Sequence, residues 1–216
     1  MQMFARTVVW LSALVLSLIL ALSAGVPVTV AVQGVSASKQ LALREGMRKL
    51  WEDHVTWTRL YIVSAVADLP DKEATAQRLL QNQADIGNAV ASFYGKLAGD
   101  KLTALLRTHI LTAVDLIAAA KQGDTAKVKD ASARWYANAD DIAAFLSGAN
   151  PKNWPLAEMR SMMRAHLDRT LAEAVARVKG DWAADVAAYD KVHQQILEMA
   201  DMLSMGIIRQ FPQKFR

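Results

Sequence analysis

Apolar residues recur along most of the chain at steps of three and four, the spacing of one face of a helix. The clearest stripe includes a histidine and consists of Leu102, Leu105, Leu106, His109, Ala113, Leu116 and Ala120. No segment of the sequence alternates apolar and polar residues at period two, so we expect no strands. The body is also rich in Ala, Leu, Met, Lys, Glu and Gln, which favour helix. The pattern predicts an all-α fold.

Glycine and proline interrupt this pattern at a few places and divide the body into six expected helices. Their ranges are 40–68, 72–93, 98–121, 125–147, 156–179 and 182–209. Two of the breaks have the same sequence, Gly-Asp, at Gly123 and Gly180. A glycine suits the end of one helix there, and an aspartate suits the N-cap of the next.

The repeated Gly-Asp belongs to a longer internal repeat. A shift of 57 residues superimposes residues 105–148 on residues 162–205, and with them His109 on His166. A weaker copy lies upstream, where His54 stands 55 residues before His109. Repeats of this length indicate stacked supersecondary units. We therefore predict three tandem antiparallel helical hairpins, a six-helix bundle, over residues 38–210.

A long uncharged stretch precedes the body. Residues 8–32 contain no charged side chain, and about 20 apolar residues suffice to span a bilayer as a helix. Residues 1–37 are therefore expected to be a signal peptide or a membrane anchor. A basic start and small residues near Ala31 or Ala37 favour a cleaved signal, whereas the total length favours an anchor. A buried core helix is the third interpretation.

The position of the body relative to the membrane rests on two opposing signals. Lys39, Arg44, Arg48 and Lys49 follow the apolar stretch, and the positive-inside rule alone would keep the body in the cytoplasm. A short N-terminal segment with Arg6 before it is the usual layout of an export signal. We expect the body in the cell envelope, either secreted or periplasmic, or anchored in the membrane through residues 8–32.

The charge and composition exclude several classes of function. The net charge is +4 and the charged residues are scattered, which argues against a nucleic-acid groove. The absence of cysteine excludes disulfides, thiolate catalysis, cysteine-ligated metals and c-type haem. Residues 211–216 form a basic, aromatic tail, which we expect to fray.

Each repeat contains a histidine and a carboxylate at similar distances from its turn. His109 lies 15 residues before Asp124 and Asp141 lies 17 after it, a difference of only about 3 Å along a helix. The antiparallel hairpins should therefore place an imidazole level with a carboxylate. An amide precedes each carboxylate by three residues, on the same face. The expected groups are His54 with Asp85 and Asn82, His109 with Asp141 and Asn138, and His166 with Glu198 and Gln195.

Two interpretations of these groups stay open. Imidazole and carboxylate are ordinary ligands of transition metals, and the candidate ligands are His54, Asp85, His109, Asn138, Asp141, His166 and Glu198. Alternatively, each carboxylate only satisfies a buried histidine and holds its hairpin together. Haem is a further candidate, since Met162 and Met163 lie near His166. The sequence contains no Glu-x-x-His pair, zinc-protease, Walker or dinucleotide-binding motif.

Several segments of the body resemble a family of bacterial helical proteins that have no established function. These segments are Trp51-Glu-Asp-His-Val-Thr-Trp-Thr-Arg59, Phe93-Tyr-Gly95, Ala119-Ala-Lys-Gln-Gly-Asp124, 135–146 and Gln210-Phe-Pro212. Some members carry the label acetylglutamate kinase. That enzyme is an α/β protein with glycine-rich phosphate loops, and this sequence shows neither. The resemblance implies a helical body and no particular activity.

The sequence therefore predicts an exported or membrane-anchored, non-catalytic helical protein that binds a partner or ligand or has a structural role. The alternative is a metal- or haem-binding protein that uses the histidine and carboxylate pairs between facing helices. An enzyme of unfamiliar type, built on the same residues, is a third hypothesis. The expected partners are the membrane, through residues 8–32, and another protein or a second copy of this chain.

Overall fold

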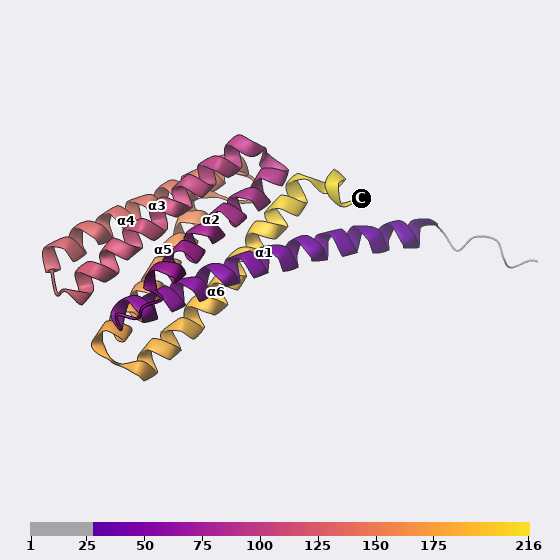
Figure 1. The fold of residues 1–216 in the computed structure, drawn as a ribbon. Coiled ribbons are helices and arrows are strands. Elements are labelled where there is room, and N and C mark those ends of the chain that lie inside the picture. The colour runs from indigo at the N-terminus through magenta and orange to yellow at the C-terminus, as the bar shows by residue number, and fades with distance from the viewer. Residues whose placement is uncertain (1–27) are drawn as a thin grey trace, which may run out of the picture.

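The computed structural model describes residues 28–216, and every structural statement below concerns this range. The signal peptide or anchor predicted over residues 1–37 lies mostly outside the described residues. Six α-helices follow one another with short connections (Figure 1). They are α1 (Val28–Val66), α2 (Lys72–Tyr94), α3 (Lys96–Lys121), α4 (Thr125–Ala149), α5 (Leu156–Lys179) and α6 (Trp182–Gln210), with a final 3₁₀ helix, η1 (Pro212–Phe215).

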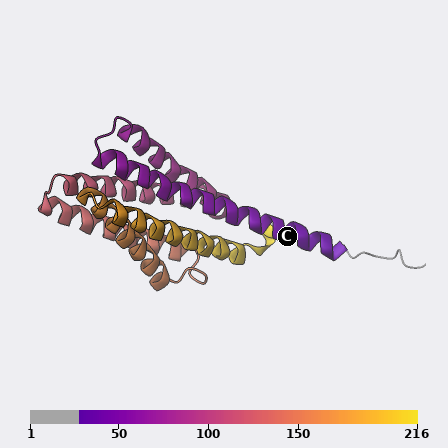
Figure 2. The ribbon, with the colours of Figure 1, turned by 90° about the horizontal axis from the view of Figure 1, so that it is seen from below.

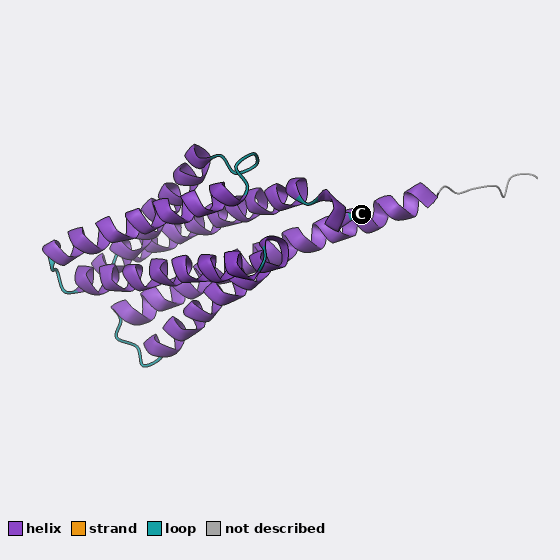
Figure 3. Cartoon of the chain, turned by 90° about the horizontal axis from the view of Figure 1, so that it is seen from above, coloured by secondary structure: helices purple, strands orange, loops and turns teal. Residues whose placement is uncertain are grey.

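The predicted all-α fold of three helical hairpins is confirmed. Figure 3 shows helices and loops, and the described part of the chain contains no strand. The hairpins are α1 with α2, α3 with α4, and α5 with α6, and their turns lie together at one end of the bundle (Figure 1). Five of the six helices begin and end within two residues of the predicted positions.

The first helix differs most from its prediction. It was expected to begin at residue 40, but α1 begins at Val28 and continues through Gly34 into the body. A single glycine costs a helix only about 1 kcal/mol, which does not end a long helix. As a result, the last residues of the apolar stretch belong to the helix that enters the bundle, and α1 projects beyond the other helices (Figures 1 and 2).

The helices close into a ring in chain order, because α6 returns to pack against α1. Within this ring α1, α3 and α5 also contact one another, whereas α2, α4 and α6 lie further out. The odd-numbered helices therefore form the centre of the bundle. Each of them contains one of the three repeated histidines, so the repeat brings these residues toward a common axis.

The turns follow the predicted chemistry. Gly123 and Gly180 adopt positive φ angles of 69° and 73°. The carboxylates of Asp124 and Asp181 accept hydrogen bonds from the backbone N–H groups of Lys127 and Ala184, at 3.0 and 3.1 Å. These are N-caps of α4 and α6. In the first hairpin Asp68 takes the glycine's place at a φ of 53°, a conformation that aspartate tolerates better than most residues.

The C-terminal tail is ordered, and the prediction that it frays is wrong. Phe215 is buried and belongs to the main core. Its ring stacks on Phe93 at 6.0 Å, and Lys214 donates a hydrogen bond to the carbonyl of Ser92. The prediction followed from the position of the tail at the end of the chain, whereas its two phenylalanines supply the apolar surface that fixes it to α2.

One described helix, α3, is long and apolar enough to cross a membrane by length and composition. However, 44% of its most apolar window is buried inside the bundle. Core helices of soluble proteins meet the same test, so α3 is only weak evidence for membrane association.

Two glycines allow α2 and α3 to approach closely, and this contact gives a first testable prediction. A Cβ at Gly99 would lie 2.5 Å from the carbonyl oxygen of Gly87 and 2.6 Å from the Cβ of Ala91. We expect Gly99→Ala to lower the free energy of unfolding by about 1–3 kcal/mol through overpacking. Urea unfolding followed by circular dichroism would measure it.

Gly46→Ala in α1 is the matched control, because nothing lies within 4 Å of its added Cβ. Alanine favours helix over glycine by roughly 0.5–1 kcal/mol, so this variant should be slightly more stable than the parent. Equal stability of Gly99→Ala and the parent would contradict the close approach of α2 and α3.

Candidate functional site

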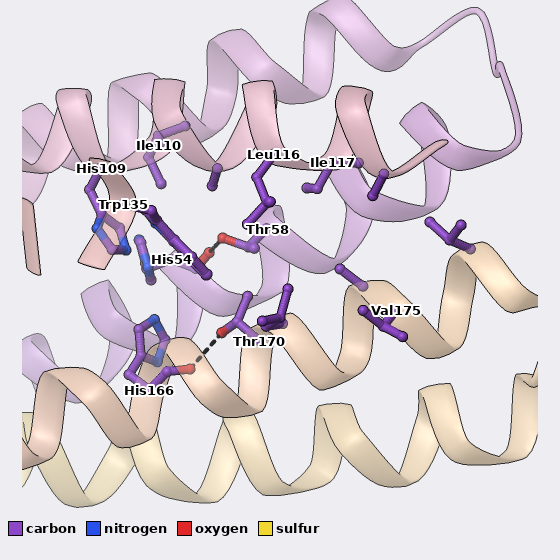
Figure 4. A pocket seen from close by; sticks show the side chains of 15 residues that line it. His54, Thr58, His109, Ile110, Leu116, Ile117, Trp135, His166, Thr170 and Val175 are labelled. Carbon is purple, nitrogen blue, oxygen red and sulfur yellow. Dashed lines mark hydrogen bonds between the residues drawn. The ribbon is translucent and has the colours of Figure 1, made fainter. Parts of the chain in front are cut away.

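The three repeated histidines meet at the centre of the bundle. His54 comes from α1, His109 from α3 and His166 from α5, and each is only 3% exposed. The ring of His166 lies 5.7 Å from that of His54 and 6.4 Å from that of His109, measured between centroids. Figure 4 shows the three imidazoles together on the wall of one cavity. Residues more than 100 positions apart therefore form a single cluster.

Each histidine is held by a side-chain amide from the second helix of its own hairpin. Nδ1 of His109 lies 3.0 Å from the amide oxygen of Asn138, and Nδ1 of His166 lies 3.1 Å from that of Gln195. Nδ1 of His54 lies 3.3 Å from the amide nitrogen of Gln83. The amide follows its histidine by 29 residues in all three hairpins. The contact is therefore a property of the repeat.

The same amides also tie the two helices of each hairpin together. Asn138 donates to the carbonyl of Leu105 at 3.2 Å, and Gln195 donates to the carbonyl of Met162 at 3.3 Å. Each of these carbonyls lies four residues before the histidine. In the first hairpin two residues make these two contacts. Gln83 contacts His54, and the neighbouring Asn82 donates to the carbonyl of Leu50 at 3.0 Å. The buried polar groups of each hairpin thus form a small network.

The predicted pairing of imidazoles with carboxylates is wrong. Asp141 and Glu198 are exposed, and Glu198 accepts a hydrogen bond from Gln194. Asp85 lies at the edge of the bundle, beside Gln81 and Arg78. In the second and third hairpins the carboxylate lies three residues after the amide that faces the histidine. In the first hairpin Asp85 lies three residues after Asn82, the neighbour of that amide. That step turns the side chain about 60° away from the axis and moves it about 4.5 Å along the helix. An uncharged amide also avoids the cost of burying a carboxylate.

The difference between amide and acid gives a second testable prediction. Asn138→Ala should lower the free energy of unfolding by about 2 kcal/mol, because it leaves Nδ1 of His109 and the Leu105 carbonyl buried without partners. Asp141→Ala, one turn further along the same helix, should change stability by less than about 0.5 kcal/mol. Urea unfolding of both variants would measure the contrast. A larger loss for Asp141→Ala would restore the pairing with the carboxylate.

Burial keeps the three imidazoles neutral. Burial, together with the nearby His166, lowers the pKa of His109 to about 3, and burial lowers that of His166 to about 4. Burial also lowers the pKa of His54 well below its ordinary value, and the other two histidines add to this effect. At neutral pH each ring therefore has one N–H and one lone pair.

A cavity of about 40 Å³ lies beside the three rings. It runs between α3 and α5 toward the hairpin turns, past Thr58 and Thr170, as far as the half-exposed Val175 (Figure 4). Both threonine hydroxyls donate to carbonyls of their own helices, those of His54 and His166. The rest of the wall is almost entirely apolar and includes Ile110, Leu116, Ile117, Leu171 and Ala174. One water molecule needs about 10–15 Å³ of such cavity volume, so the cavity has room for about three water molecules.

The rings of all three histidines line this cavity. Nδ1 of each ring contacts an amide of the outer helix, so Nε2 is the ring nitrogen that faces away from that helix. Within residues 28–216 no hydrogen bond is made by Nε2 of His54, His109 or His166. A ring nitrogen without a protein partner on an otherwise apolar wall is available for a hydrogen bond with a molecule in the cavity.

The predicted metal ligands are only partly brought together. The three histidines meet, with Asn138 behind one of them, but Asp85, Asp141 and Glu198 lie away from the cluster. Within the described range no three His, Asp or Glu side chains stand close enough to hold one metal ion. A porphyrin is also far larger than the cavity of about 40 Å³ beside His166.

A second buried polar cluster was not expected from the sequence. Arg59 of α1 donates to both carboxylate oxygens of Asp185 in α6, through Nη1 and, at 2.7 Å, through Nη2. It also donates to Glu173 of α5 at 3.1 Å, while Arg177 donates to Asp185 at 3.2 Å. Glu173 and Asp185 are almost completely buried. The only sequence signal would have been polar residues on otherwise apolar helix faces.

The two acids of this cluster differ in their ionisation. Burial raises the pKa of Glu173 to about 7, although the contact with Arg59 opposes the shift. Burial would also raise the pKa of Asp185, but Arg59 and Arg177 together hold it below the ordinary value. Asp185 is therefore the charged partner of both arginines, and Glu173 takes up a proton near neutral pH.

Comparisons with known proteins found no matching family model, no similar curated protein and no similar solved structure.

Proposed function

We propose that this protein is a non-catalytic binding protein of the cell envelope, exported or attached to the membrane by residues 8–32. Its ligand site is the cavity beside His54, His109 and His166. The observation on which the proposal depends is that the almost completely buried rings of these histidines line one cavity, and that their Nε2 atoms make no hydrogen bond within the described residues. A site that binds a small ligand commonly has mostly apolar walls with a few convergent polar groups, and this cavity has that composition.

The acid–base properties of the cluster favour binding over catalysis. A general base works best when its pKa lies near the operating pH. Burial lowers the pKa of His109 to about 3 and that of His166 to about 4, so both imidazoles are weak bases at neutral pH. The carboxylates that would complete a catalytic group lie away from them.

A transition metal ion is the second candidate ligand, because a neutral imidazole with a free Nε2 is its commonest protein ligand. The three rings would have to move to share one ion, since they do not stand in that arrangement. Elemental analysis of the purified full chain separates the two candidates. A stoichiometric transition metal would favour the ion, and its absence would favour a small organic ligand.

Xenon provides a direct test of the cavity, because it enters apolar cavities without needing a hydrogen bond. We expect the full chain in detergent to bind xenon in a saturable manner, seen as a shift in the ¹²⁹Xe NMR signal. Ala113→Leu should abolish the shift, because Ala113 lines the cavity. Ala118→Leu is the control, because Ala118 is exposed on the same helix. Failure of xenon to bind the parent, or equal binding by Ala113→Leu, would contradict the proposed site.

A further inference from the structure

The amide partners determine which nitrogen of His109 and His166 has the proton. The amide nitrogen of Asn138 donates to the carbonyl of Leu105, so its oxygen must be the atom that faces His109. An amide oxygen only accepts, and Nδ1 of His109 is therefore the N–H donor. Gln195 imposes the same arrangement on His166, because its nitrogen donates to the carbonyl of Met162. In both rings Nε2 is left with a lone pair toward the cavity.

The first hairpin imposes the opposite arrangement on His54. The amide nitrogen of Gln83 donates to the carbonyl of Leu79 at 2.7 Å and faces the amide oxygen of Asn82 at 3.1 Å. An exchange of the oxygen and nitrogen of Gln83 would place its oxygen against both of these acceptors. The nitrogen therefore faces His54, and its two hydrogens are shared among Leu79, Asn82 and Nδ1 of His54, while Oε1 of Gln83 stays buried without a partner. Because an amide nitrogen cannot accept a hydrogen bond, an Nδ1–H of His54 would have no acceptor in this position. The proton of this ring is on Nε2.

The cavity thus presents one N–H donor, from His54, and two lone pairs, from His109 and His166. Two consequences follow for the ligand. An anion finds two lone pairs and no positive charge, so it is excluded. A metal ion finds only two free ligands, because His54 would have to give up its Nε2 proton and its hydrogen bond with Gln83.

From this polarity we infer that the cavity binds a small neutral molecule with a primary amide group and a short apolar tail. The two N–H groups of the amide donate to Nε2 of His109 and His166, and its carbonyl accepts from Nε2–H of His54. The tail lies toward Ile117 and Leu171, along the apolar part of the wall. This inference rests on the proposed binding function and adds the chemical class of the ligand.

Size limits the ligand to about three or four non-hydrogen atoms, since the cavity has room for about three waters. Acetamide, with four such atoms, is the natural probe. Acetate has the same shape but a negative charge in place of the amide nitrogen, so it is the matched control. A water molecule also has two donors and an acceptor, and the test must therefore separate a ligand from bound water.

The test begins with the protonation of the rings in the full chain labelled with ¹⁵N-histidine. Two-bond ¹H–¹⁵N spectra at pH 7.5 distinguish Nδ1–H from Nε2–H, and four single His→Gln variants, including His193→Gln, assign the signals. We expect Nε2–H for His54 and Nδ1–H for His109 and His166. If all three rings had the same tautomer, the inference would be wrong.

Titration then tests the ligand class on the same sample. Acetamide should shift the Nε2 signals of His109 and His166, leave that of His193 in place, and bind at least tenfold more tightly than acetate. In Ala113→Leu these shifts should disappear. If xenon enters but acetamide does not bind, the cavity accepts ligands of another class or holds water only, and this inference falls while the proposed function stands. Binding of acetate as tightly as acetamide would also overturn it.

Discussion

Lowering the pH from 7 to 4.5 is expected to reduce the free energy of unfolding by on the order of 5 kcal/mol. The reason is the burial of three neutral imidazoles. Unfolded histidines bind protons below about pH 6.5. The folded chain resists this, since burial lowers the pKa of His109 to about 3, that of His166 to about 4 and that of His54 well below its ordinary value.

The direction in which the pKa values shift determines whether the free energy of unfolding rises or falls with pH. Because the folded pKa values lie below the unfolded ones, the stabilisation is complete above about pH 6.5 and is lost as the pH falls toward 4. Glu173 acts in the opposite direction. Burial raises its pKa to about 7, so its unfavourable contribution is present at high pH and disappears as the pH falls toward its unfolded value. The three histidines outweigh this single acid.

Proton uptake gives the sharpest measurement. Near pH 5.5 the unfolding of the parent should take up about two protons, because three histidines bind protons and Glu173 releases one. The slope of unfolding free energy against pH, from urea titrations between pH 5 and 7, reports this number. Glu173→Gln should raise the uptake to about three. The loss of about 5 kcal/mol is comparable with the whole stability of many domains, so we expect acid unfolding near pH 4.5.

His193 provides the control for this experiment. It is less buried than the three cluster histidines and hydrogen-bonds to Glu52 at 2.8 Å. His193→Gln should leave the acid transition in place. A stability that stays constant from pH 7 to 5 in the parent would mean that the three imidazoles bind protons in the folded chain, and would contradict their burial as neutral groups.

The helices were predictable because local chemistry determines them. Gly123 and Asp124 mark a turn through one backbone conformation and one capping bond, and both are found. The 57-residue shift likewise predicted the hairpins, although it did not predict that His109 and His166 of neighbouring hairpins meet. Periodicity and repetition are properties of the sequence alone, so no tertiary information was needed.

The partners of the histidines were harder to predict. Asn138 and Asp141 lie only three residues apart in α4, and spacing from the turn does not separate them. The free energy of burial separates them, because burying a carboxylate in an apolar core costs far more free energy than burying an amide. The buried position of Asn138 therefore follows from the free energy of burial, which the number of residues from the turn does not include. The cluster around Arg59 depends on contacts between α1, α5 and α6, and polar residues on otherwise apolar helix faces do not by themselves show which helices meet.

Arg59→Met is expected to lower the free energy of unfolding at pH 8 by about 3–5 kcal/mol, the usual cost of leaving a buried charge without its partner. Arg59 is the only described cation that contacts Glu173, and its removal leaves Asp185 with Arg177 alone. Since Glu173 is mostly protonated at pH 5, the cost relative to the parent should be smaller at pH 5 than at pH 8.

Arg78→Met is the matched control. Arg78 is partly exposed, with ion pairs to Asp53 and Asp85 at 4.0 and 3.6 Å, and its loss should cost less than about 1 kcal/mol. Urea unfolding of both variants at the two pH values decides the matter. Equal losses of unfolding free energy for Arg59→Met and Arg78→Met would show that the cluster is hydrated and that Arg59 does not stabilise Glu173.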